Sequence, residues 1–357
     1  MALFESLDRK PEWLDHELWE RGRVLWNNAS LAGGIGMLVG DTFGTFVGDD
    51  VAYTVGETGR FVNDALRRNV ETGAWFRAVT LKGALERFAE PFKDTVRVRL
   101  MHSQVRAGLR QRWGDNPEAP QAPDALGPRG AYAAHGDPIS SAWMMAAATT
   151  FALQPLLVDH AHGRRCSWAD LEAVTMYWNH IAHVFGVADA IIPRNARAAV
   201  EIFDWSVAHA GGPSAWTDAQ ARAAIDRPGL SGAITRALLA PALGLMAYYS
   251  GEQVTRALIG GTKLRAADLR LWTALGGAFV RGNVGFRRLA DKLPGAARRA
   301  EARETAPVYR AQKLVERLAE RRGLRGKPYD HHNATAGVAS GGAVPAPPPL
   351  PRCPVPH

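Results

Sequence analysis

The spacing of the apolar residues constrains the fold of this chain more than any other feature. In almost every segment they recur at three- and four-residue steps, as on one face of a helix, and few runs alternate Val, Ile or Thr as strands do. We therefore predict an all-α fold, a single helical domain of roughly nine or more helices. The predicted helices lie near residues 11–26, 60–73, 90–113, 139–158, 168–186, 195–210, 231–250, 266–280 and 306–322.

Two proline-rich segments set the predicted organisation of the chain. Residues 115–137 are rich in Pro, Ala and Gly, and we expect a loop that covers a site or joins two halves. Residues 326–357 carry too few large apolar side chains to pack, so we expect a disordered tail after a helical domain at 1–325. The N-terminal stretch lacks the apolar core of a signal peptide, and the two cysteines, Cys166 and Cys353, suggest a reducing compartment. We expect a cytoplasmic protein.

The net charge of +8 would suit an anionic partner. The arginines, however, are spread along the chain and are densest between Arg265 and Arg325, without zinc-finger spacing, an RNP-like aromatic motif or a compact basic arm. We therefore expect no nucleic-acid partner. Peripheral contact with a membrane surface stays open, and the sequence does not indicate the oligomeric state.

Residues 138–158 form a stretch without a charged residue that is long enough to cross a bilayer. Its Ser, Thr and Gln residues and its internal Pro155 favour a buried core helix instead.

Four glycines recur at every fourth position: Gly36, Gly40, Gly44 and Gly48. On a helix they would line one side, where another backbone or a flat ligand could approach closely. Packing between helices, or plain loop glycines, is the more common reason for such a pattern. The spacing does not match a dinucleotide-binding fingerprint.

His102 interrupts a segment that otherwise reads as a buried helix. On a helix it has Val98, Val105 and Leu109 on one side, and Arg99 and Arg106 on the other at roughly 40° to 60°. The imidazole would thus lie between an apolar row and a cationic row. Haem b requires this combination, because it needs an apolar slot, an axial ligand and cations for its propionates. A single buried histidine is, however, usually a structural residue.

An upstream helix adds a second motif, because Arg68 and Thr72 are four residues apart and so share a face. Arg-x-x-x-Thr followed by Arg-x-x-His-x-x-x-Arg resembles the pattern of the bacterial latex-clearing rubber oxygenases. The fungal oxygenase that cleaves a farnesyl chain in mycophenolic acid biosynthesis has the same domain (DUF2236). The segment MYWNHIAHVFGVAD at 176–189 is also similar to that domain, and the resemblance extends over residues 20–285.

The resemblance implies a helical fold that encloses a haem pocket and a haem b-dependent oxygenase, with iron as the metal. His102 would be the axial ligand of the iron, and Arg99 and Arg106 would bind the propionates or stabilise the helix. Arg68 and Thr72 would line the pocket as catalytic residues. The substrates would be dioxygen and a small apolar alkene of isoprenoid type.

The family also uses an acidic residue shortly before the Arg-x-x-x-Thr motif as a base. Asp49, Asp50 and Glu57 are the candidates here, and Glu71 next to Thr72 departs from the basic residue that some rubber oxygenases carry. Apolar residues at 142–153 and 237–249 are candidate walls of the substrate pocket.

Other kinds of site have weaker support. His180 and His183 could share a helix face as metal ligands, but a di-iron bundle needs Glu-x-x-His pairs that the chain lacks. The histidine-containing segments 159–163 and 330–333 have no further ligands for a zinc site, and the hydrolase, Walker and kinase motifs are missing. The alternative to an oxygenase is a non-enzymatic helical protein that binds a lipid or a membrane surface.

Overall fold

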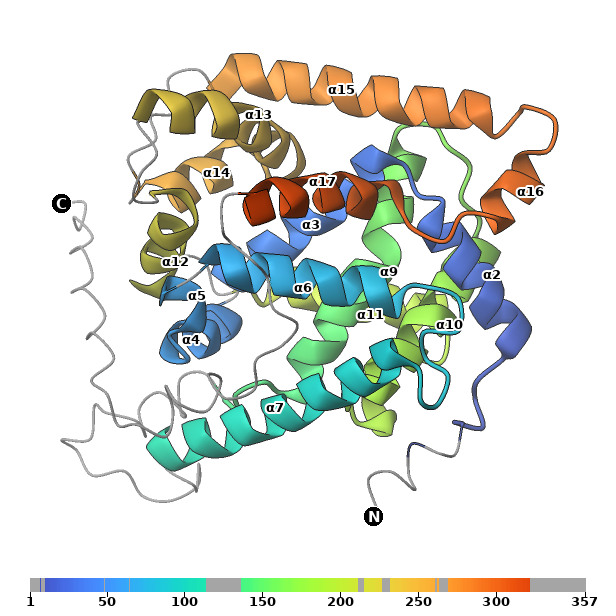
Figure 1. The fold of residues 1–357 in the computed structure, drawn as a ribbon, viewed down its shortest axis with the longest axis horizontal. Helices are drawn as coiled ribbons and strands as arrows, with labels where there is room; N and C mark the ends of the chain where they lie inside the picture. Colours follow the sequence, from blue (N-terminus) through green and yellow to red (C-terminus); the bar gives the residue numbers. More distant parts are fainter. Residues whose placement is uncertain are drawn as a thin grey trace.

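The computed structural model describes residues 10–47, 49–63, 65–113, 136–210, 215–226, 232–260 and 269–321, together with Leu7 and Thr262. This part of the chain is a single helical domain without a strand, so the all-α prediction is confirmed (Figure 1). Its helices are α2 (His16–Asn27), α3 (Leu31–Val47), α4 (Asp49–Glu57), α5 (Arg60–Asn63), α6 (Ala65–Val79), α7 (Glu90–Trp113), α9 (Ser141–Ala161), α10 (Trp168–Phe185), α11 (Ala196–Ala208), α12 (Ala215–Ile225), α13 (Gly232–Ser250), α14 (Glu252–Ile259), α15 (Leu269–Ala290), α16 (Ala296–Glu301) and α17 (Pro307–Arg321), with a 3-10 turn at Asp189–Ile191.

The core of the domain is aromatic. Trp26 of α2 lies 5.4 Å from Trp178 of α10 and 5.8 Å from Tyr309 of α17, measured between ring centroids. Its indole N–H donates a hydrogen bond of 2.8 Å to the carbonyl oxygen of Phe151 on α9. Aromatic pairs of this kind add stability beyond the area that they bury. They join elements from both ends of the sequence into one unit.

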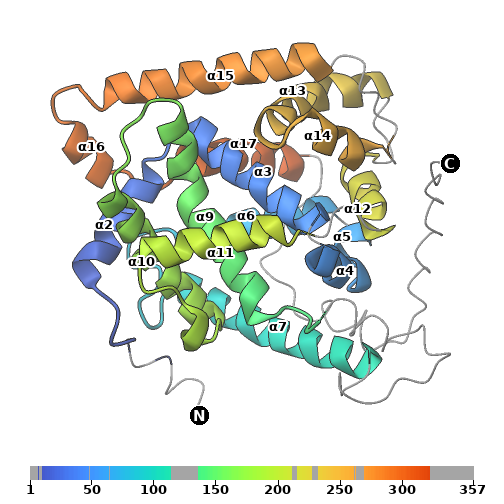
Figure 2. The same ribbon diagram turned by 180° about the vertical axis from the view of Figure 1, so that it is seen from behind.

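The uncharged segment forms α9, which passes through the middle of the domain (Figures 1 and 2). By length and composition α9 could cross a membrane, and the bent pair α3 and α4 would pass the same test. Half of that stretch of α9 is buried by the rest of the protein, including Met145, Leu153 and Leu156. The helices α3, α10 and α11 all pack on α9. It is therefore a central core helix, as the sequence predicted in preference to a membrane-spanning helix.

The glycine-rich segment is also a helix, α3, and its glycines let α9 approach closely. A side chain at Gly33 would begin 2.5 Å from the carbonyl oxygen of Pro155, and one at Gly36 would begin 2.8 Å from Val158. Gly44 has open space around its Cα, and Gly48 lies outside the described residues. Gly36 of the glycine pattern therefore serves helix packing, whereas Gly44 faces open space.

The predicted loop at 115–137 is described only from residue 136 onward, and the predicted tail at 326–357 lies outside the described residues. The domain boundary at residue 325 stays a prediction.

Candidate active site

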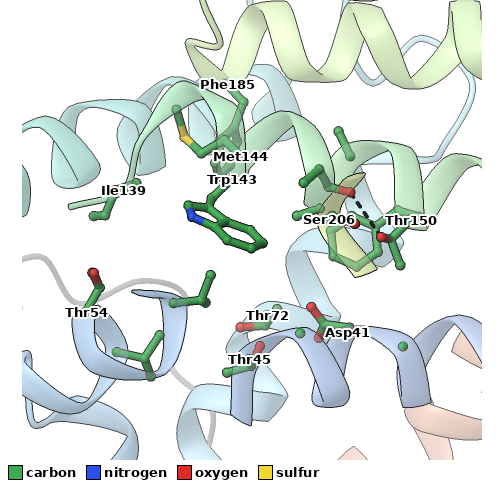
Figure 3. A pocket seen from close by; sticks show the side chains of 18 of the residues that line it. Asp41, Thr45, Thr54, Thr72, Ile139, Trp143, Met144, Thr150, Phe185 and Ser206 are labelled. Atoms are coloured by element: carbon green, nitrogen blue, oxygen red, sulfur yellow. Dashed lines mark hydrogen bonds between the residues drawn. The ribbon is translucent and has the colours of Figure 1, made fainter. Parts of the chain in front are cut away.

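A cavity of about 910 Å³ lies between α9, α10 and α11 on one side and α3, α4, α6 and α7 on the other. Most of its wall is apolar. The segment 142–153 supplies much of this wall, whereas Tyr249 is the one described residue of 237–249 that lines it. Figure 3 shows Trp143 pointing from α9 toward the helices that carry Asp41, Thr54 and Thr72. The cavity is of the size and polarity of sites that bind a cofactor or an apolar substrate.

His102 projects from α7 into this cavity, where Val98 and Val105 from the same helix face line the wall beside it. The ring packs edge-on against Phe185 at 5.0 Å. Its Nδ1 is sealed from solvent without a hydrogen-bond partner, and its Nε2 is not sealed and bonds to no described residue. Burial, with the nearby charges of Arg68 and Arg106, lowers the pKa of His102 to about 3. The imidazole is therefore neutral at physiological pH, the form that binds metals.

Arg68 and Thr72 line the same cavity from α6. The hydroxyl of Thr72 donates a hydrogen bond of 2.8 Å to the carbonyl oxygen of Arg68, which fixes its rotamer along the helix. The charge of Arg68 lowers the pKa of both His102 and Asp41, so the guanidinium lies within electrostatic reach of both side chains. No carboxylate in the described part of the chain forms an ion pair with Arg68. The cavity thus holds a cation that is free to meet an anionic group.

Asp41 is a site residue that the sequence reasoning missed. It projects from α3, lines the cavity, and has its pKa raised to about 6 because burial disfavours the carboxylate. Of the acidic candidates, Glu57 and the buried Glu71 do not line the cavity, and the side chains of Asp49 and Asp50 lie outside the description. The one sequence signal for Asp41 was its place beside Gly40 in the glycine pattern.

Arg99 and Arg106 do not line the cavity. Arg99 donates a hydrogen bond of 3.5 Å to the carbonyl oxygen of His183 at the end of α10. Arg106 donates hydrogen bonds of 3.2 and 2.6 Å to the carbonyl oxygens of Pro138 and Ile139, just before α9. Both guanidiniums therefore attach α7 to its neighbours. This contact corresponds to the second of the two roles predicted for them, which was to stabilise the helix. Their binding of propionates stays a prediction.

His180 and His183 have separate surroundings. His180 is buried against Trp19, and burial lowers its pKa to about 3, whereas His183 pairs with Asp189 at 2.8 Å. Over the residues that the structure describes, no three His, Cys, Asp or Glu side chains cluster closely enough to hold a metal ion. A metal at this cavity would therefore need a ligand set that the cofactor itself completes.

Comparison with known proteins identifies the family of the chain. The family model described as "ER-bound oxygenase mpaB/B'/Rubber oxygenase, catalytic domain" matches residues 21–289, about three quarters of the chain. A solved structure, that of latex clearing protein LCP in the closed state, is similar in fold with a TM-score of 0.55 and 20% identity, over 87% of this chain and 77% of that one. No curated protein matches. The family match covers the helices that enclose the cavity, and we conclude that the chain belongs to the mpaB and rubber oxygenase family, whose members are oxygenases.

Proposed function

We propose that this protein is a haem b-dependent oxygenase that acts with dioxygen on an apolar alkene of isoprenoid type. The observation that carries the proposal is the neutral imidazole of His102 at the wall of a large apolar cavity, where its Nε2 bonds to none of the described residues. Because this nitrogen is not sealed and the ring is neutral, its lone pair is available to coordinate iron.

The other residues at the cavity fit this cofactor. Its volume of about 910 Å³ lies near the upper end of the range for cofactor sites, leaving space for part of a substrate chain. Arg68 is a cation at the wall that no described carboxylate pairs with, and it is suited to a carboxylate of the cofactor. Arg99 and Arg106 would reach a propionate only by giving up their carbonyl partners, so Arg68 is the better candidate among the three.

Haem b, when bound, supplies the iron at which dioxygen is activated for transfer to the alkene. The chain supplies the rest. Asp41 holds a proton on its carboxyl group up to a pH of about 6, so it can give or take one proton at the cavity near neutral pH. Arg68 tunes this equilibrium, because its charge favours the carboxylate. The hydroxyl of Thr72 keeps its lone pairs available to a polar atom in the cavity.

The cavity wall supports an apolar substrate. Phe76, Met144 and Ile181 come from three different helices and line it together with the indole of Trp143 (Figure 3). Such walls bind a hydrocarbon chain by excluding water and offer few hydrogen bonds to fix its polar groups. We infer that the substrate is recognised by shape and length.

An absorption spectrum of the purified chain tests the proposal. We expect a Soret band in the wild type after expression with sufficient haem, and its loss or shift in His102→Ala. His209→Ala is the control, because His209 is exposed at the end of α11 and does not line the cavity. Equal haem binding by His102→Ala would refute the axial role. Absence of haem in the wild type would favour the alternative, a lipid-binding protein without activity.

A further inference from the structure

An apolar stripe lies on the outer face of α15. The stripe consists of Leu271, Leu275, Phe279, Phe286 and Leu289, whose exposed fractions range from 40% to 72%. At 100° per residue these five side chains fall within an arc of about 80°. The opposite face, with Val280 and Val284, packs against Leu245 and Tyr249 of α13 and Ala32 of α3. The helix is therefore apolar on both its buried face and its solvent-exposed face.

A row of arginines accompanies the stripe. Arg270, Arg281 and Arg288 lie within about 20° of one another on the helix, about 80° to 100° from the nearest edge of the stripe and at the border of the exposed face. All three are exposed, and none forms an ion pair with any acidic side chain that the structure describes. From residue 269 to 299 the chain has a single acidic residue, Asp291, which is already paired with Arg164. Leu293 and Lys292 continue the same character beyond the helix.

We propose that α15 is a docking surface for an anionic lipid bilayer. The stripe would enter the boundary between headgroups and acyl chains, while the arginine row, at the border of the exposed face, would reach the lipid phosphates above it. Figures 1 and 2 show α15 along one edge of the molecule, opposite α7, so the helix can lie flat on a surface. The long arginine side chains of α15 can keep their charged ends in water while their aliphatic stems cover apolar surface.

Charge distinguishes a bilayer from a second copy of this chain as the occupant. A symmetric dimer through α15 would pack the same patch of both copies together, so neither copy could offer a carboxylate of α15 to the arginine row of the other. No unpaired carboxylate on α15 could compensate the arginine rows, since Asp291 is the only acidic residue in the segment and is already paired. An anionic bilayer is complementary to the stripe and to the row at once.

Flotation of the full chain with vesicles tests this proposal. We expect the wild type to bind vesicles of phosphatidylcholine with about 30% phosphatidylserine, and to bind pure phosphatidylcholine at least about tenfold more weakly. Phe286→Gln with Leu289→Gln should weaken binding about tenfold or more, and Arg270→Gln, Arg281→Gln and Arg288→Gln together about 100-fold. Phe88→Gln is the control, because Phe88 is 69% exposed in the loop between α6 and α7.

Circular dichroism verifies that each variant folds. Binding that is independent of phosphatidylserine, or that survives the stripe variant, would overturn the proposal. So would a dimer in light scattering that the stripe variant converts to the 38.7 kDa monomer, because the face would then be an interface between copies of this chain.

Discussion

Asp41 gives the first prediction at the scale of single residues. Its pKa is about 6 in the folded protein against 3.8 as the ordinary value, so the folded state binds the proton more tightly than the unfolded state. The ionised carboxylate therefore lowers stability above pH 6, and this cost disappears as the pH falls from 6 to 4. Asp41→Asn should be more stable than the wild type at pH 7 to 8 by about 1–2 kcal/mol, less than the full shift because water enters the cavity.

Urea unfolding of both proteins between pH 4 and pH 8 measures this difference. The gain from Asp41→Asn should shrink toward zero at pH 4. Asp204→Asn on the exposed side of α11 is the control and should show little change across the range. A gain that does not vary with pH would mean that the carboxylate is solvated at the cavity and is not the proton-holding group.

Sequence reasoning located part of the site for physical reasons. Helical periodicity placed Val98 and Val105 on one side of His102, and the structure has these three side chains at one cavity wall. Periodicity could not reveal what lies opposite the arginines of α7, because the carbonyl acceptors of Arg99 and Arg106 come from other elements. Asp41 was missed for the same reason, since only the folded chain brings α3 to the cavity that α6 and α9 also line.

At the scale of helices, the contact between α3 and α9 gives a matched pair of predictions. Gly33→Ala would place its Cβ 2.5 Å from the carbonyl oxygen of Pro155 and 2.8 Å from Oδ1 of Asp159, so a backbone has to move. Overpacking of this kind should lower the free energy of unfolding by about 1–3 kcal/mol. Gly44→Ala meets nothing within 4 Å and should raise it by about 0.5–1 kcal/mol, because alanine restricts the unfolded chain.

Denaturant titrations of the two variants check the pair. Loss of stability in both would mean that α3 is strained along its whole length and not only at its contact with α9. No change in Gly33→Ala would mean that the two helices can separate without cost.

Helices were predictable where polar and apolar residues alternate with the helical period. The segment 90–113 matches α7 at both ends, and 168–186 matches α10 to within one residue. The segment 31–47 was not among the predicted helices, because glycine has a low helix propensity. The close contact of this segment with α9, which explains why it is rich in glycine, is visible only in the folded chain. The short helices α4, α14 and α16 were also absent from the prediction, since a short helix gives only a weak periodic signal.

At the scale of the whole molecule, the cavity joins elements that are distant in the sequence. Asp41, Arg68, His102, Trp178 and Val254 come from five helices and line one space. A cofactor in this space would lie among these helices, and such a site forms only in the folded chain. Binding should therefore stabilise the domain as a unit.

Haem at 100 times its dissociation constant should add about 2.7 kcal/mol to the free energy of unfolding, and so raise Tm by about 5 °C or more. Thermal melts followed at 222 nm, with and without haem, measure this shift. His102→Ala should lose most of the shift, whereas the melt of the haem-free variant should stay close to that of the haem-free wild type. Two separate transitions in the loaded wild type would show that the helices around the cavity unfold independently, and the cofactor would then be held by only part of the domain.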